Sequence, residues 1–283
     1  MSAPPRVVIF GFGFLGAALA REFAAAGWSV TCASLTGTAG CLACDLGDPD
    51  AVARVAQHAG PTDLLIHCAA SGRGGPDAYQ RVYVEGASNL ITAFPGVPLI
   101  FTSSTSVYGQ TDGSLVDEAS PAIPDRQTSQ LLLDAELLVL ASGGIVARLS
   151  GIYGPGRSMI LQKFLAGEAT IEEDGQRILN QVHRDDIATA IVHLAGQRAC
   201  HRGEIFNITD STPLSQLECY SALARQFHRP LPPSGPRDLA RKRAWTHKRV
   251  SNARLLATGW RPRFPCFLDA ATEIAASLAP AGS

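Results

Sequence analysis

Three glycines near the start of the chain, Gly11, Gly13 and Gly16, have a spacing that can bind the phosphates of a dinucleotide. They directly follow a short apolar run and open an alanine-rich segment, the strand, turn and helix context that a G-x-G-x-x-G loop requires. Such a loop needs glycine for the tight turn, for backbone approach to a pyrophosphate and for packing of helix on strand. The N-terminus of the helix offers unpaired N–H groups to the anion. We predict a dinucleotide site rather than a plain turn, with Phe14 and Leu15 beside the phosphates.

The residues that would face the adenosine ribose indicate which dinucleotide binds. An acidic residue about 20 positions beyond the glycines binds the ribose of NAD in such folds, but no acidic residue lies between Glu22 and Asp45. Ser34 and two threonines after it lie where a 2′-phosphate would be, although the same stretch holds no Arg or Lys to neutralise the phosphate. The sequence therefore favours NADP over NAD. We expect Asp45 and Leu46 to border the adenine, unless Asp45 only caps a turn.

The elements that would position this loop alternate between strands and helices. Apolar runs of strand length occupy residues 6–10, 29–33, 63–68, 99–102 and 145–149, and helical patterns occupy 14–26, 49–58, 82–94 and 129–140. This order predicts an α/β fold, a Rossmann-type doubly wound parallel sheet with crossover helices. We place this dinucleotide-binding domain over residues 1–150, completed by a later strand near 204–208. Residues 151–283 would form mainly a small substrate-binding region.

The composition excludes several classes of protein. The 283 residues are 46% hydrophobic and only 17% charged, so the chain can bury a full core. Lys and Arg number 24 against 25 Asp and Glu, which gives no field that would attract nucleic acid. No apolar stretch reaches the ~20 residues of a membrane span, and no charged segment followed by an apolar one resembles a signal peptide. We expect a cytoplasmic protein that binds a small-molecule substrate, without a nucleic-acid or membrane partner.

Two local patterns invite other readings. The seven cysteines are an odd number and include Cys41 and Cys44 in a C-x-x-C spacing, but no second such pair or nearby histidine pair completes four zinc ligands. Reduced, buried thiols are therefore expected, and no metal site is predicted. The basic run over residues 237–249 is expected to be a solvated helix face, because it also contains Asp238 and the whole chain is near neutral.

Seven segments in chain order resemble the signatures of the extended short-chain dehydrogenase/reductases, of the NAD-dependent epimerase/dehydratase type. They are the glycine loop, Asp45-Leu46, His67–Ala70, Phe101–Gly109, Arg148–Gly156, Val182–Asp186 and Glu204–Asn207. The glycine spacing, together with TSSTSVYG and GPGR, is most similar to the YeeZ-like subgroup. The resemblance implies that the following residues line the cofactor site, the last two at its nicotinamide end: Cys68, Ala69, Ala70, Thr102 and Ser103.

The resemblance also implies a catalytic residue and a proton relay. Ser104, aligned by the VYG that follows it, would orient a substrate oxygen, although a hydroxyl-rich strand end can also satisfy its own backbone. The family's relay is Tyr-x-x-x-Lys, in which the lysine lowers the pKa of the tyrosine during hydride transfer. Arg126 and Gln130 stand at these two positions. No lysine precedes Lys163, and no tyrosine has a lysine four residues on, so the standard relay is absent.

Other polar groups could replace the missing acid or hold the substrate. Tyr108 follows the aligned serine closely, although the equivalent tyrosine of relatives is usually structural. His183 has a useful pKa near neutrality, although the residue type favours a packing or hydrogen-bonding role at a strand end somewhat more. Arg126 and Arg157 are poor proton donors but good anion clamps, and they suggest an anionic group on the substrate. The Asp185-Asp186 pair is expected to cap a helix rather than to catalyse.

The sequence thus predicts an NAD(P)-dependent oxidoreductase or epimerase-like enzyme that acts on a small polar metabolite without the usual relay. The alternative is a catalytically silent dinucleotide-binding protein, either a redox-state sensor or an assembly factor, which the absent Tyr and Lys favour. A lyase or isomerase that only inherited the fold is a third reading, because fold does not determine function. The resemblance also makes a homodimer through paired helices possible.

Overall fold

The computed structural model describes residues 3–72, 74–237 and 245–278. Its centre is a sheet of seven strands, in the order β12-β7-β5-β4-β1-β2-β3, whose neighbours all pair in parallel. The strands are β1 (Arg6–Phe10), β2 (Ser29–Ser34), β3 (Leu42–Ala43), β4 (Leu64–His67), β5 (Leu99–Ser104), β7 (Ile145–Leu149) and β12 (Ile205–Ile208). The order reverses at β1, so this is the doubly wound α/β fold that the sequence predicts.

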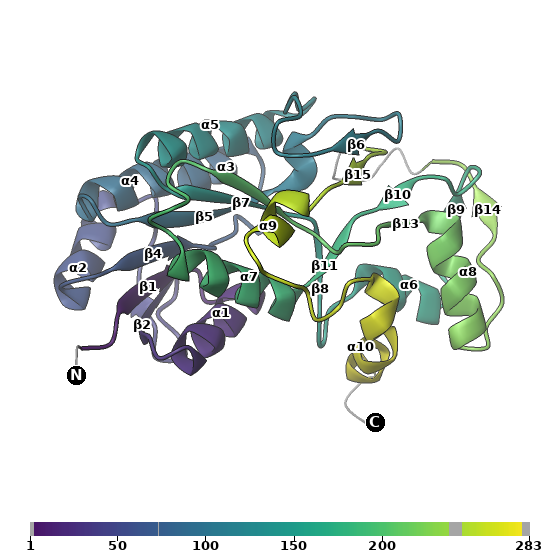
Figure 1. The fold of residues 1–283 in the computed structure, drawn as a ribbon, viewed down its shortest axis with the longest axis horizontal. Coiled ribbons are helices and arrows are strands. Elements are labelled where there is room, and N and C mark those ends of the chain that lie inside the picture. The colour runs from purple at the N-terminus through teal and green to yellow at the C-terminus, as the bar shows by residue number, and fades with distance from the viewer. Residues whose placement is uncertain (1–2, 73, 238–244, 279–283) are drawn as a thin grey trace.

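Helices cover both faces of the sheet (Figure 1). One face packs against α1 (Phe14–Ala25) and α7 (Arg184–Gly196), which contribute Leu19 and Ile191 to a common core. The other face packs against α2 (Pro49–Ala59), α4 (Gly86–Ala93) and α5 (Gln127–Ala141). The apolar strands need an apolar partner on each face of the sheet, and the two layers of helices provide it and exclude water.

The helix predicted over residues 82–94 begins earlier than expected. Helical backbone starts at α3 (Pro76–Tyr79), continues through a π-helical stretch (Gln80–Glu85) and ends with α4. Pro76 is the first helical residue, and its fixed φ and missing N–H suit that position. The predicted start was therefore wrong, because the helical backbone begins six residues before Val82.

Residues beyond β7 form a smaller region with its own core, centred on Tyr153, Phe164, Tyr220 and Phe267. Its helices are α6 (Met159–Leu165), α8 (Gln216–Gln226) and α10 (Ala271–Leu278), with a 3₁₀ turn at Phe267–Ala270. The short helix α9 (Ala253–Ala257) instead packs against β12 and adds Leu255 to the core beneath α1 and α7. Its strands are short and pair as β8 (Gly151–Tyr153) with β11 (Gln181–His183), β9 (Ile171–Glu172) with β14 (Ser234–Gly235), and β10 (Ile178–Leu179) with β13 (Leu214–Ser215). A further pair joins β6 (Leu115–Val116) to β15 (Arg249–Val250).

Besides α9, the strand β12 and the helix α7 return from this later part of the chain to the large sheet. β12 adds beside β7 with the register Ile205↔Val146, at the position predicted for a late strand near 204–208. α7 packs against α1 on the opposite side of the sheet from α5. Among the residues that the structure describes, no helix is both long and apolar enough to cross a lipid bilayer.

Candidate active site

In the glycine loop between β1 and α1, two glycines lie too close to neighbouring backbone atoms to carry a side chain, and the third faces open space. A Cβ on Gly11, whose φ is +105°, would lie 2.4 Å from the backbone nitrogen of Ala69, and a Cβ on Gly16 would lie 1.8 Å from the carbonyl oxygen of Gly11. A Cβ on Gly13 would have no heavy atom within 4 Å. Gly13 is the N-cap of α1 and provides no side-chain cap, and the first turn of α1 carries no acidic residue. The helix N-terminus is therefore open to an external anion.

Two arginines flank Phe14 at this helix N-terminus. The guanidinium carbon of Arg157 lies 5.1 Å from the centre of the Phe14 ring, and that of Arg184 lies 4.8 Å from it. The turn after β8 reaches the ring because Gly154 has no side chain: a Cβ there would be 3.1 Å from Cζ of Phe14. Arg184 is also paired with Asp185 at 2.9 Å. Arg157, predicted for the substrate, thus lies beside the phosphate loop, and Arg184 is a neighbour that the sequence analysis missed.

The end of β2 and the start of α2 form the adenosine side of the predicted site. The Ser34 hydroxyl accepts a hydrogen bond from the Gly37 N–H at 3.2 Å. Asp45 accepts from the Gly47 N–H at 2.9 Å and from Arg81 at 2.8 Å, and this Arg81 bond holds the pKa of the Asp45 carboxyl below its usual value. Leu46 is buried beneath them. Asp45 is thus a charged turn cap, which is the alternative role that the sequence leaves open for it.

Three hydroxyl residues end β5, and they point to different partners. Thr102 donates to the carbonyl oxygen of His67 at 3.2 Å. Ser103 is buried and donates to Glu136 at 2.5 Å, on the side of the sheet that α5 covers. The Ser104 hydroxyl accepts a bond from the Ser106 N–H at 3.1 Å and caps the following 3₁₀ turn. Ser104 still has its own proton to donate, so it can hold a substrate oxygen.

Tyr108 lies in a buried polar network beneath these hydroxyls. Its hydroxyl donates to Asn207 at 2.9 Å and accepts from Arg148 at 2.9 Å. Arg148 is in turn paired with Glu136 at 2.6 Å, and both side chains are at most 5% exposed. Burial raises the pKa of the Tyr108 hydroxyl, although the Arg148 charge opposes this. The phenol proton is already donated to an amide oxygen, so this geometry supports a structural role for Tyr108.

His183 also lies in the interior. It is 1% exposed, and its ring contacts Tyr153 and Phe264. Burial lowers its pKa, which keeps the ring neutral. Its Nδ1 accepts the Asp185 N–H at 3.1 Å and so caps α7.

The expectation that Asp185 and Asp186 cap this helix is wrong. The structure makes His183 the N-cap, and Asp185 and Asp186 lie in the first turn of α7, beyond the cap. The Asp186 carboxylate accepts from the backbone N–H groups of Arg263 at 2.7 Å and Phe264 at 3.0 Å, and thereby ties the C-terminal loop to α7.

The two positions of the missing relay lie at the start of α5. Arg126 is the N-cap residue of this helix, and the Gln130 amide donates to Asp134 at 3.1 Å. Ser129, in the same turn, donates to Ser106 at 3.3 Å, which brings this turn against the loop that follows Ser104. The structure therefore places Arg126 and Ser104 in neighbouring segments.

Lys248 is a residue that the sequence analysis misjudged. It was expected on a solvated helix, but it is 3% exposed, precedes β15, and its ammonium group donates to the carbonyl oxygen of Tyr108. Burial lowers its pKa to about 8. Part of the basic run, residues 238–244, lies outside the described residues. The expectation was wrong for Lys248 because it followed the general rule that charged side chains are exposed. The backbone oxygen that accepts from Lys248 is far away in sequence, so no local pattern indicates the contact.

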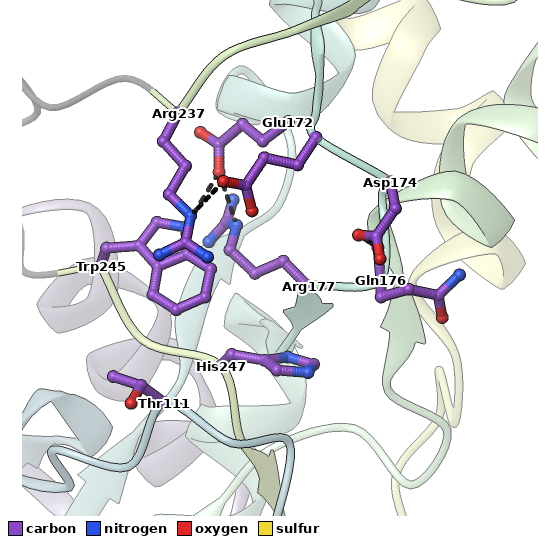
Figure 2. A pocket seen from close by; sticks show the side chains of 9 residues that line it. Thr111, Glu172, Asp174, Gln176, Arg177, Arg237, Trp245 and His247 are labelled. Carbon is purple, nitrogen blue, oxygen red and sulfur yellow. Dashed lines mark hydrogen bonds and ion pairs between the residues drawn. The ribbon is translucent and has the colours of Figure 1, made fainter.

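Two neighbouring pockets lie in the C-terminal region. Figure 2 shows the smaller one, of about 170 Å³, where Glu172 pairs with Arg177 at 3.0 Å and accepts from the Trp245 indole N–H at 3.3 Å. Arg237 covers the Trp245 ring at 3.8 Å and pairs with Glu173 at 2.8 Å. Glu172 and Arg177 also line the larger pocket, of about 360 Å³. Charged groups of both signs suit a polar ligand.

These observations define a Rossmann-type dinucleotide fold with a hydroxyl at the end of β5 and a polar pocket on the C-terminal side. The model of the NAD-dependent epimerase/dehydratase family matches residues 7–209, so the chain belongs to this family. The YeeZ protein of Escherichia coli is 31% identical over 243 residues, which cover 78% of this chain and 83% of YeeZ.

Two solved structures show the same fold over nearly the whole chain. One, from Methylobacillus flagellatus and described as an NAD-dependent epimerase/dehydratase, is 30% identical with a TM-score of 0.79, and the match covers 98% of this chain and 99% of that one. The other, the human epimerase family protein SDR39U1 solved with NADPH, is 21% identical with a TM-score of 0.79, and covers 96% and 99%. The predicted family resemblance and the predicted fold class are thereby confirmed.

Proposed function

We propose that the protein is an NAD(P)-dependent oxidoreductase or epimerase-like enzyme that acts on a small polar metabolite. The observation that carries this proposal is the open N-terminus of α1 at Gly13, flanked by Arg157 and Arg184, on the same edge of the sheet as Ser104. Ligands of doubly wound folds bind at the carboxyl ends of the strands, where the strand order reverses.

The cofactor we propose is a nicotinamide dinucleotide, with NADP preferred over NAD. The preference rests on Ser34, because a hydroxyl at the end of β2 tolerates a 2′-phosphate that a carboxylate would repel. The family is named for NAD, whereas the human relative was solved with NADPH, so relatives of both kinds exist. Arg157 and Arg184 would face the phosphates together with the N–H groups of α1.

In the proposed reaction the nicotinamide supplies or accepts a hydride, and this chain positions the substrate. The Ser104 hydroxyl donates to the substrate oxygen, and Arg126 in the neighbouring segment holds an anionic group of the substrate. Because the Tyr108 hydroxyl donates to Asn207 and His183 is buried, we propose that the proton comes from water held against Ser104. The two pockets lined by Glu172 and Arg177 lie in the region assigned to the substrate, and we propose that they receive the rest of it.

The test compares wild-type protein with Ser104→Ala and Arg126→Ala, using NADPH and NADH with panels of aldehydes, ketones and imines. Loss of one preorganised donor lowers turnover by about 10²-fold, which is the result we expect for Ser104→Ala. Arg126→Ala should raise KM more than it lowers kcat. Ser120→Ala, a change in an exposed turn, is the control. Turnover that is unaffected in Ser104→Ala would show that the active site lies elsewhere.

One observation favours a second function, that of a catalytically silent dinucleotide-binding protein. Arg126 and Gln130 stand at the positions where the relay tyrosine and lysine would be, and the Gln130 amide is engaged with Asp134. A sensor or assembly factor keeps the cofactor loop and loses the relay. Tight nucleotide binding without turnover of any substrate in the panel would establish this function.

A further inference from the structure

Cys32 in β2 and Cys41, the residue before β3, lie beside each other, and their side chains are hydrogen-bonded. β2 and β3 pair with the register Ala33↔Leu42 and Ser34↔Ala43, and continuing this register by one residue brings Cys32 opposite Cys41. Cross-strand neighbours are separated by about 4.8 Å, inside the range of about 4.4–6.8 Å between the Cα atoms of a disulfide. Burial raises the pKa of the Cys32 thiol to about 11, and the thiol of Cys41 beside it raises the pKa further. Both cysteines are reduced in the structure.

The other nearby thiols are excluded as partners by their geometry. Side chains alternate between the faces of a sheet, so Cys44, three residues after Cys41, faces the opposite side. Cys44 indeed belongs to the core beneath α2 and α4, whereas Cys32 packs against the core beneath α1. Cys68 follows β4, and β1 lies between β4 and β2, so about two strand spacings separate Cys68 from Cys32. The C-x-x-C spacing of the sequence therefore does not mark a pair, and Cys32 is the partner of Cys41.

The two cysteines stand at the two ends of the loop on the adenosine side of the proposed cofactor site. Between them lies Ser34, whose hydroxyl accepts from Gly37 at 3.2 Å, and the hydroxyls of Thr36 and Thr38 are bonded to each other at 3.3 Å. The polar groups of this loop are thus turned toward one another. To bind a 2′-phosphate the loop must turn these groups toward the ligand.

We propose that Cys32 and Cys41 are a reversible disulfide site, and that its oxidation by a low-molecular-weight disulfide restricts this loop and weakens NADPH binding. The effect on NADPH rests on the proposed function, whereas the disulfide itself does not. Disulfides of reducing compartments are usually transient and regulatory, and this pair fits that class.

The chemistry is thiol–disulfide exchange. Cys32 is the more exposed of the two cysteines. Once deprotonated, its thiolate attacks a sulfur of glutathione disulfide, slowly because the pKa of the thiol is raised, forms a mixed disulfide and releases one glutathione thiolate. The second cysteine thiolate attacks the cysteine sulfur of that mixed disulfide, forms the bond between Cys32 and Cys41 and releases the second glutathione. Two cysteine thiols are oxidised, glutathione disulfide is reduced to two glutathione thiols, and the protons of the cysteines end on the released glutathione.

Peptide mapping tests the disulfide. The full chain is equilibrated with glutathione disulfide or with dithiothreitol, free thiols are alkylated, and linked peptides are identified by mass spectrometry. We expect a link between Cys32 and Cys41 in the wild type, in Cys44→Ser and in Cys200→Ser, a change at an exposed thiol, and none in Cys41→Ser. The oxidised wild type should also have a Tm several degrees higher, because the crosslink constrains the unfolded chain. A link between Cys41 and Cys44, or full alkylation of Cys32 and Cys41 after oxidation, would overturn the proposal.

Fluorescence titration with NADPH tests the consequence. Oxidation should lower the NADPH affinity of the wild type at least threefold, leave the affinity of Cys41→Ser unchanged, and be reversed by dithiothreitol. Equal NADPH affinity of the oxidised and reduced wild type overturns the coupling to the cofactor. A protein that binds neither NADPH nor NADH would instead refute the proposed function, and the peptide map would still decide the disulfide.

Discussion

The guanidinium of Arg157 lies over the ring of Phe14, 5.1 Å from its centre, and this contact joins the turn after β8 to the glycine loop. The two residues belong to the two halves of the molecule. Phe14 is the first residue of α1, and Arg157 lies in the G-P-G-R turn of the C-terminal region. A positive charge is therefore held beside the helix N-terminus, where a pyrophosphate would add a negative charge.

Arg157→Ala should weaken dinucleotide binding. The guanidinium is exposed, so its contribution is modest, about 1 kcal/mol or a fivefold change in Kd, and it should shrink as salt is added. Isothermal titration with NADPH at two salt concentrations measures both effects. Arg225→Ala, at the exposed end of α8, is the matched control. Equal affinities of the two variants would remove Arg157 from the site.

Gly13 and Gly16 should respond differently to alanine. Gly13→Ala places its Cβ in open space and should lower Tm by no more than a few degrees, the cost of alanine at an N-cap. It should nevertheless lower dinucleotide affinity at least tenfold, because the backbone can no longer approach the pyrophosphate. Gly16→Ala should lower Tm strongly, since its Cβ would lie 1.8 Å from the Gly11 carbonyl oxygen. Thermal unfolding and fluorescence titration separate the two effects. Unchanged binding in both Gly13→Ala and Gly13→Val would contradict the proposed cofactor loop.

Much of the central sheet could be predicted because its strands carry their own signal. The strands 6–10 and 145–149 have the predicted bounds, since a strand buried on both faces is a continuous apolar run. The short strands β9 and β14 could not be predicted: each has two residues, and their pairing depends on where a long loop returns. Local sequence determines the first kind of element, and tertiary contacts determine the second.

The candidate site divides in the same way. The glycine loop is contiguous, so its spacing and the strand and helix patterns on either side were enough to predict it. The contact of Arg157 with Phe14 and the burial of Lys248 depend on segments far apart in the chain, and no local pattern marks them. Tyr108 shows the converse: its place after Ser104 suggested an acid, and only the structure shows the Arg148 and Asn207 bonds that occupy its hydroxyl.

Ser34→Asp should shift cofactor preference toward NADH. The carboxylate would repel a 2′-phosphate and accept hydrogen bonds from the ribose hydroxyls, so NADPH affinity should fall about tenfold while NADH affinity is kept or improved. Asp can retain the bond from the Gly37 N–H that Ser34 now accepts, so the loop should keep its shape. Ser34→Asn separates charge from size. A wild type that already binds NADH tenfold more tightly than NADPH would refute the proposed preference.

Glu136→Gln should destabilise the fold by about 3–5 kcal/mol, because it leaves the buried Arg148 charge without its partner. Urea unfolding followed by circular dichroism gives the free energy of unfolding. Tyr108→Phe removes bonds to Arg148 and Asn207 but no charge, and it should cost less, about 1–3 kcal/mol. If Glu136→Gln unfolds at the same urea concentration as the wild type, the pair does not support the fold.

Asp210 should make the protein less stable as the pH rises. It is 3% exposed, and one of its carboxylate oxygens is buried without a hydrogen-bond partner, as are the Tyr153 hydroxyl and the His183 Nε2. Burial raises the pKa of the Asp210 carboxyl from 3.8 to about 8, although the Phe267 N–H favours the charged form. The nearby Asp269 carboxylate raises the pKa further.

The sign of the effect follows from which state holds the proton. Below about pH 4 Asp210 is protonated in both the folded and the unfolded chain and does not lower the free energy of unfolding. Between about pH 4 and pH 8 only the folded chain keeps the proton, so the free energy of unfolding falls as the pH rises. Asp210→Asn should remove this slope and be more stable than the wild type at pH 8, by on the order of a few kcal/mol, while the two converge near pH 4. Because every other titrating group remains in both proteins, the difference between them isolates Asp210. Urea unfolding across this pH range measures it, with Asp50→Asn on the exposed start of α2 as the control. A stability difference between Asp210→Asn and the wild type that does not change with pH would show that Asp210 is ionised in the fold.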